Sequence, residues 1–108
     1  MPIFIKTEKF KDQTLKLSNS ERKVFLLMHQ KWVKDIRQSG NYIHSGYLIN
    51  EKKMPGGGGL LIIEAKDYLS AQKIIAKDPM ITNDLVNWEL QEWIPVNGSK
   101  PKFFNHLG

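Results

Sequence analysis

The sequence has no cysteine among its 108 residues, so disulfide bonds and thiolate metal sites are excluded. It also lacks an apolar run of about 18 residues, the length that a membrane-spanning helix requires. Its first residues do not combine a basic leader with a long apolar stretch, as a signal peptide would. These absences predict a cytoplasmic protein that does not enter a membrane.

Histidine is scarce as well. The chain has three, His29, His44 and His106, and no two of them are four residues apart on a predicted helix. Zinc sites generally contain closely spaced pairs of ligands. We therefore predict that the protein has no metal site.

The chain is basic, but its positive charges are not grouped. Sixteen Lys and Arg against eleven Asp and Glu give a net charge of +5, and the excess lies in the first 53 residues. A nucleic-acid-binding surface needs basic residues grouped on one face with interleaved aromatic residues, whereas the lysines from Lys6 to Lys34 are scattered singly. We interpret them as a solvated surface and predict no nucleic-acid partner.

The hydrophobic content of 41% is that of an ordinary globular domain. We place one domain at residues 1–96 and a tail at 97–108. Alternating apolar residues, rich in β-branched and aromatic types, predict the strands. These are expected at residues 3–10, 41–50, 58–65 and 86–95, and residues 11–17 are expected to form a loop.

Two helices are predicted between the strands. The first covers residues 18–39, because Ser18 and Glu21 match a capping box and Gly40 suits the residue that ends a helix. The second covers residues 67–77 and ends before Pro79. The first helix carries an apolar stripe that we expect to face the core, made of Val24, Phe25, Leu27, Met28, Trp32, Val33 and Ile36.

The order strand, helix, strand, strand, helix, strand predicts a ferredoxin-like α+β fold, an antiparallel sheet with both helices on one face. Strands 3–10 and 58–65 are apolar on both faces and belong at the centre of this sheet. Their second apolar face needs a cover, and the chain has no further helix to supply one. We therefore predict a homodimer that forms through the sheet faces.

Four consecutive glycines follow Pro55, at residues 56–59. A phosphate-binding loop would lead into a helix N-terminus and carry a following Lys-Ser or Lys-Thr. This run leads into a predicted strand instead. We interpret it as a hairpin turn.

Two titratable residues are candidates for chemistry. His29 lies beside the apolar stripe of the first helix, and histidine is the side chain that commonly changes charge near neutral pH. Asp78 falls at the end of the second helix, where unpaired carbonyl groups disfavour a carboxylate. From these residues alone, a packed histidine and a solvated aspartate remain open alternatives to a functional pair.

The sequence resembles the YCII-related proteins over residues 22–95. The likeness is carried by His29 with Gly40 eleven positions later, the strand YIHSGYL, the strand LLIIEAKD, Ala71, and the run Lys77-Asp78-Pro79. The resemblance implies a dimeric α+β barrel of ferredoxin-like protomers. It also implies a pocket in which a histidine and an aspartate act as general acid and base, and here they fall on His29 and Asp78.

Two residues depart from the pattern of this family. Tyr47 stands where the family has proline, and His44 stands at a position that is usually small or apolar. Both lie on the predicted strand 41–50, and with Tyr42 they are our candidates for contacts to a substrate.

The resemblance predicts a cofactor-independent enzyme that acts on an unknown small molecule, by lyase-like or hydrolase-like acid–base chemistry. The alternative is a non-catalytic dimeric module that binds a small ligand or a protein, for which Phe103 and Phe104 in the tail offer aromatic contacts. Another chemistry of the same fold, such as that of a monooxygenase or an isomerase, is a third possibility.

Overall fold

The computed structural model describes residues 1–98. Its strands are joined in the order β2-β3-β1-β4, and all three pairings are antiparallel. This confirms the predicted ferredoxin-like α+β fold, with the two strands that are apolar on both faces at its centre. The elements are β1 (Ile3–Phe10), α1 (Asp12–Leu15), α2 (Asn19–Gln38), β2 (Ile43–Ile49), β3 (Pro55–Glu64), α3 (Tyr68–Ile75), α4 (Pro79–Thr82) and β4 (Val86–Trp93).

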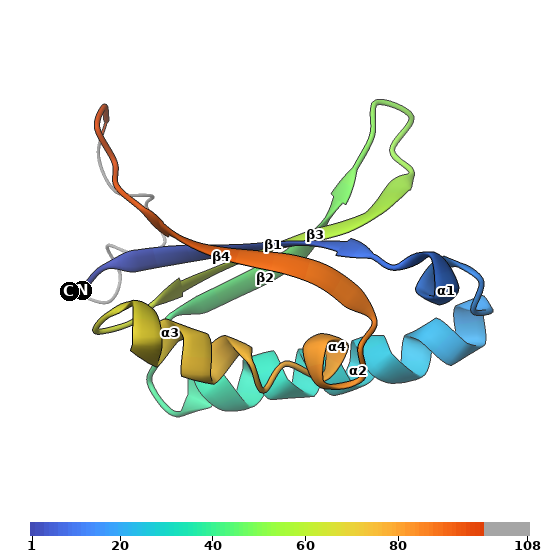
Figure 1. Ribbon diagram of the computed structural model, residues 1–108, viewed down its shortest axis with the longest axis horizontal. Coiled ribbons are helices and arrows are strands. Elements are labelled where there is room, and N and C mark those ends of the chain that lie inside the picture. Colours follow the sequence, from blue (N-terminus) through green and yellow to red (C-terminus); the bar gives the residue numbers. More distant parts are fainter. Residues whose placement is uncertain (99–108) are drawn as a thin grey trace.

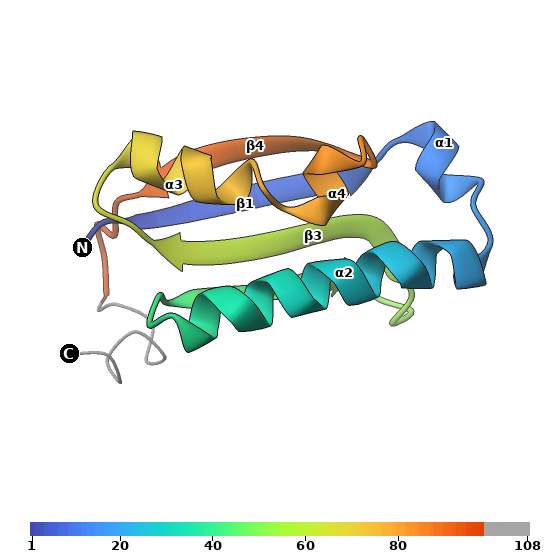
Figure 2. The same cartoon turned by 90° about the horizontal axis from the view of Figure 1, so that it is seen from below.

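The helices cover one face of the sheet (Figure 1). Seen from that side, α2 runs along β2 and β3, while α3 and α4 follow one another over β1 and β4 (Figure 2). The main core fills the space between the two layers, and burying one of its large side chains contributes about 1.5–3 kcal/mol. Its buried members are Phe4, Ile43, Leu61, Ile63, Ala65, Ala71, Ile75 and Leu90.

Helix α2 begins and ends as predicted. Ser18 and Glu21 form the capping box through both of its hydrogen bonds, and Gly40 has the left-handed φ of +93° that suits the position after a helix. Within residues 1–98, no helix combines the length and apolarity needed to cross a membrane.

The predicted apolar stripe of α2 is too wide. Trp32, Val33 and Ile36 pack against the main core, but Val24, Leu27 and Met28 are exposed. A helix lying on one side of a sheet has only one face against it, so residues at the edge of the stripe or beyond it point to solvent.

Two short helices were not expected. Helix α1 lies in the segment predicted as a loop. Its Thr14 hydroxyl donates a hydrogen bond of 2.7 Å to the carbonyl of Leu85, the residue before β4. Helix α4 begins directly after Asp78, with Pro79 in its first turn. Proline is favoured there because the first amides of a helix have no partner within it.

The glycine run lies inside a strand, so its prediction as a hairpin turn is wrong. Strand β3 begins at Pro55, and the turn falls before it. At Gly58, an added Cβ would lie 2.8 Å from the carbonyl oxygen of Glu8 on β1. Glycine therefore permits the two central strands to approach closely at this register.

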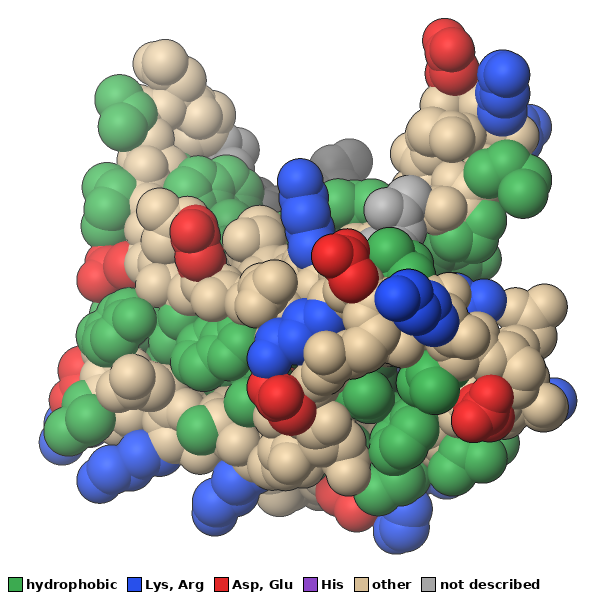
Figure 3. All heavy atoms as spheres, turned by 45° about the vertical axis from the view of Figure 1, so that its right-hand side comes forward, with side chains coloured by type: hydrophobic (Ala, Val, Ile, Leu, Met, Phe, Trp, Pro, Cys, Tyr) green, Lys and Arg blue, Asp and Glu red, His purple; other side chains and the backbone are tan. Residues whose placement is uncertain are grey.

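The centre of the sheet face that points away from the helices is apolar, and no described helix or strand covers it. The strand registers place Ile5 opposite Ile62 and alternate the side chains between faces, so Ile5, Leu60 and Ile62 share this outer face. The β2–β3 hairpin and the segment after β4 both rise from it (Figure 1). A hollow separates the two projections, and hydrophobic side chains are visible on both (Figure 3).

Candidate acid–base site

Side chains from four elements meet between the sheet and the helices. His29 comes from the middle of α2, Ser45 from β2, Asp78 from the residue before α4, and Lys6 and Glu8 from β1. The distance along the chain between His29 and Asp78 is 49 residues. The two helix–sheet crossovers of the fold are what bring them together.

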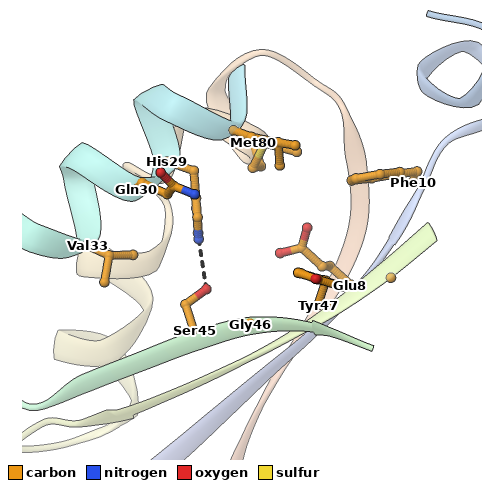
Figure 4. Close-up of a pocket in the computed structure, with 12 residues that line it drawn as sticks. Glu8, Phe10, His29, Gln30, Val33, Ser45, Gly46, Tyr47 and Met80 are labelled. Atoms are coloured by element: carbon orange, nitrogen blue, oxygen red, sulfur yellow. Dashed lines mark hydrogen bonds between the residues drawn. The ribbon is translucent and has the colours of Figure 1, made fainter. Parts of the chain in front are cut away.

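His29 is held at both ring nitrogens. Nδ1 lies 2.8 Å from Oδ1 of Asp78, and Nε2 lies 2.8 Å from the Oγ atom of Ser45 (Figure 4). An ionised carboxylate only accepts hydrogen bonds. Nδ1 therefore carries a proton and donates a hydrogen bond to Asp78. In the neutral imidazole, Nε2 is then an acceptor, and the Ser45 hydroxyl donates to it.

Asp78 is completely buried, yet it is fully hydrogen-bonded. Its Oδ1 atom also accepts from the backbone N–H of Met80 at 2.9 Å, and its Oδ2 atom accepts from Nζ of Lys6 at 2.7 Å. Burial raises the pKa of Asp78, but the hydrogen bond from His29 and the charge of Lys6 outweigh burial and hold the pKa below its ordinary value. The site therefore contains a buried carboxylate anion.

The sequence suggested that Asp78 lies in an unfavourable place, at the end of a helix. The structure shows the reason that it is tolerated. Asp78 follows α3, but it is also the N-cap of α4, where unpaired amides favour a carboxylate. The short helix that the sequence did not reveal thus supplies the Met80 amide to the carboxylate.

Lys6 was predicted to be one of the solvated lysines, and this is wrong. Its side chain is completely buried on the helix-facing side of β1, and its Nζ atom lies 2.7 Å from Asp78 and 2.5 Å from Oε1 of Glu8. A signal for this was present in the sequence. Phe4, Lys6 and Glu8 alternate in a central strand and so share one face.

A cavity of about 380 Å³ opens beside His29. Figure 4 shows the Ser45 hydroxyl and the Glu8 carboxylate at different sides of this space, with Met80 and Phe10 along its rim. Most of the lining is apolar or glycine. It consists of Glu8, Phe10, Leu26, His29, Gln30, Val33, Ser45, Gly46, Tyr47, Gly58, Gly59 and Met80.

The structure separates the three residues predicted to contact a substrate. Tyr47 lines the cavity, but Tyr42 and His44 do not. Successive side chains of a strand point to opposite faces, and Tyr42 and His44 lie on the outer face of the sheet with their rings 5.6 Å apart. Within one chain, Tyr42 and His44 therefore do not reach this cavity, and their contact with a substrate stays a prediction. The ring centroids of Trp32 and His29 are 5.7 Å apart, and Trp32 also packs against the main core.

Among residues 1–98, no group of three or more His, Cys, Asp or Glu side chains is arranged to hold a metal ion. His106 lies outside the described residues. The chemistry that the described site offers is proton transfer, because an oriented imidazole faces a cavity and a buried anion stands behind it.

Solved structures that are similar to this fold include the following three. A 5-chloro-2-hydroxyhydroquinone dehydrochlorinase from Burkholderia phenoliruptrix, solved with 2,5-dihydroxybenzoquinone, is 18% identical over 85% of this chain and 93% of that chain, with a TM-score of 0.64. An antibiotic biosynthesis monooxygenase is 15% identical over 90% and 100%, with a TM-score of 0.55. A protein from Arabidopsis thaliana is 12% identical over 93% and 100%, with a TM-score of 0.53.

No protein-family model and no curated protein matches the sequence. At identities below a fifth, the structural likeness shows the fold alone. The fold and the site together define the class of molecule. It is a ferredoxin-like α+β protein with a hydrogen-bonded His–Asp pair at a cavity.

Proposed function

We propose that the protein is a cofactor-independent enzyme that acts on a small molecule, with His29 as general acid and base and Asp78 as the residue that orients it. The hydrogen bond between Nδ1 of His29 and buried Asp78, at the wall of a cavity, carries this proposal. The dehydrochlorinase neighbour supports it in part, because elimination chemistry occurs on this fold. The relation to the YCII-related proteins and the cytoplasmic location belong to the same proposal.

The proposed step moves one proton. Nε2 of His29 takes a proton from a C–H or O–H bond of the bound molecule, and the electron pair of that bond expels a leaving group or shifts within the molecule. The imidazolium then returns the proton to the leaving group or to the product. Asp78 stays ionised and stabilises the imidazolium. Ser45 must turn away from Nε2, or be displaced by the substrate, before this step.

A generic proton-abstraction probe tests the proposal without knowledge of the natural substrate. The ring of 5-nitrobenzisoxazole opens when its carbon-bound proton is removed, and the product is followed by absorbance. General-base catalysis contributes about 10²–10⁴-fold to such a step, so His29→Gln should lose most of the rate above buffer. Asp78→Asn should lose part of it, and Ser45→Ala should keep it because Nε2 becomes free. Equal rates for the wild type and His29→Gln would overturn the proposal.

The tautomer of His29 provides a second readout that needs no turnover. Nitrogen-15 NMR of the wild-type protein should show the proton on Nδ1, because Asp78 accepts it. In Asp78→Asn, the amide can donate as well as accept, and the proton should shift toward Nε2. An identical spectrum in the variant would contradict the proposed role of Asp78.

A second candidate function is acyl transfer, and the hydrogen bond from Ser45 to Nε2 favours it. Ser45, His29 and Asp78 then stand in the order nucleophile, base and orienting acid. A fluorophosphonate probe tests this reading. The Ser45 oxygen bonds to phosphorus, the phosphorus–fluorine bond breaks, and His29 takes the serine proton. A mass increase on Ser45 that requires His29 would support acyl transfer, and an unlabelled protein would exclude it.

The non-catalytic alternative, a dimeric module that binds a ligand or a protein, depends on Phe103 and Phe104. Both lie outside the described residues. It predicts that removal of residues 99–108 abolishes the capture of a partner while the probe reaction stays at the buffer rate.

We infer that a second copy of the chain covers the outer face of the sheet. Ile5, Leu60 and Ile62 form an apolar surface there, and the two projections beside it carry exposed Leu48, Ile94 and Val96. Apolar surface of this kind on an isolated chain generally marks an interface. Sedimentation equilibrium at micromolar concentration should give twice the mass of one chain, and the mass of a single chain would contradict the inference.

A further inference from the structure

Glu8 is a second carboxylate that faces the cavity, and the proton-transfer step described above does not use it. It lies on the helix-facing side of β1, and its side chain is 10% exposed. Oε1 accepts a hydrogen bond from Lys6. No described residue donates to its other oxygen. Since no buried side-chain polar atom of the described residues is unpaired, this second oxygen is open to the cavity that Glu8 lines.

The charges around the cavity are unequal. Lys6 is shared by Asp78 and Glu8, so one buried cation stands against two carboxylates. Among the described residues that line the cavity, none is a Lys or Arg. With a neutral His29, the group as a whole carries one negative charge, and the part of that charge exposed to a ligand is the open oxygen of Glu8. This oxygen would repel an anionic ligand, and no described residue of the lining carries a positive charge that would offset the repulsion.

The rest of the lining sets the second requirement. Phe10, Leu26, Val33 and Met80 present apolar atoms to the ligand. A cationic ligand would be attracted by Glu8, but it would lose its hydration among these side chains, and desolvation of an ammonium group costs much more than desolvation of a hydroxyl group. The combination favours an uncharged ligand with an apolar body and one hydrogen-bond donor.

We propose that Glu8 is the residue that selects the ligand. Its open oxygen accepts a hydrogen bond from a hydroxyl group of an uncharged, ring-sized molecule, and the cavity discriminates against anions such as carboxylates. Lys6 acts as a positioning residue, because it fixes Oε1 of Glu8 and Oδ2 of Asp78 at once. The placement of the reacting atom at His29 rests on the proposed function, but the selection of the ligand by charge does not.

Three probes of one shape test this proposal. They are 2-naphthalenemethanol, 2-naphthoate and 2-naphthalenemethylamine, which are neutral, negative and positive at pH 7. Dissociation constants are measured from NMR shifts of the His29 imidazole. A hydrogen bond to a charged acceptor commonly changes affinity by about tenfold or more, so the alcohol should bind the wild type at least about tenfold tighter than the carboxylate.

Glu8→Gln removes the charge and keeps the shape. It should reduce the preference for the alcohol over the carboxylate by about fivefold or more, mainly through tighter binding of the carboxylate. Glu89→Gln is the matched control, because Glu89 is an exposed carboxylate on the outer face of neighbouring β4. It should leave the preference unchanged.

Several results would overturn the proposal. They are equal wild-type affinities for the alcohol and the carboxylate, tightest binding of the amine, no binding of the alcohol at its solubility limit, or an unchanged preference in Glu8→Gln. The wild-type comparison decides the matter even where Glu8→Gln does not fold. These binding readouts do not depend on turnover, so a failure of His29 as a base, seen in the benzisoxazole assay, is distinguishable from a failure of Glu8.

Discussion

The two faces of the sheet are built from the same four strands but carry different kinds of side chain. The helix-facing side buries a lysine between two carboxylates and leaves a cavity beside a histidine. The outer side has apolar residues at its centre and no described element over it. Charged side chains are usually exposed and apolar side chains usually covered, so both of these features depart from the usual arrangement. The first carries the proposed acid–base site, and the second is the surface on which we propose that a second copy packs.

The largest expected effect concerns the lysine of the covered face. Lys6→Met leaves Asp78 and Glu8 without their shared cation, and removal of one partner from a buried ion pair costs about 3–5 kcal/mol. Lys9→Met is the control, because Lys9 lies on the opposite face of the same strand and is exposed. Urea unfolding should show a large loss for the first variant and a change within about 0.5 kcal/mol for the second. Equal losses of unfolding free energy in the two variants would contradict the predicted difference between the two faces.

A pair of neighbouring leucines tests the apolar parts of both faces. Leu61 is 1% exposed in the main core, so Leu61→Ala should cost about 2–5 kcal/mol of unfolding free energy at any protein concentration. Leu60 is its neighbour on the outer face. Leu60→Ala should act mainly on assembly, so its effect should grow with protein concentration in the range where the chain dimerises. A cost for Leu60→Ala that is independent of concentration would argue against a second copy on that face.

Much of the fold could be predicted because its signals are local. The alternation in β1, the capping box of α2 and the stop at Gly40 each depend on a few neighbouring residues. Helix α4 was missed because four residues give too short a pattern to detect. Its absence from the prediction made Asp78 look unfavourably placed.

The site was predicted less completely than the fold. His29 and Asp78 were chosen through a family resemblance, and the structure brings them into contact. Their roles remain a proposal. The alternation of Phe4, Lys6 and Glu8 in a central strand indicates that Lys6 faces the helices. Its partner Asp78 could not be predicted in this way, because it is 72 residues away and only the fold brings the two together. Alternate residues of a strand face opposite sides, and the sequence alone does not show which side of strand 41–50 the helices cover. The position of Tyr42 and His44 relative to the cavity could therefore not be predicted.

Asp78 on the helix-facing side should make the stability of the protein depend on pH. The pKa of Asp78 is held below its ordinary value although burial opposes this. The unfolded chain therefore binds a proton more readily than the folded one in the acidic range. Asp78 contributes stability above the ordinary aspartate pKa, and this contribution is lost as the pH falls through the folded value. Chemical denaturation from pH 7 down to the acid limit should show a steeper loss for the wild type than for Asp78→Asn. Parallel curves would contradict this.

The smallest effect is expected from His44 on the outer face. Burial lowers its pKa, and the charge of Arg37 lowers it further. A histidine with a lowered pKa favours the neutral form in the folded state, so stability falls as the pH drops below the ordinary histidine value of 6.5. His44→Gln should flatten this part of the stability curve, and Arg37→Gln should flatten it less, because burial remains. If a second copy covers this face, His44 is buried more deeply, and acidification should also weaken assembly. A dimer dissociation constant that does not change over this pH range would contradict the burial of His44 in the interface.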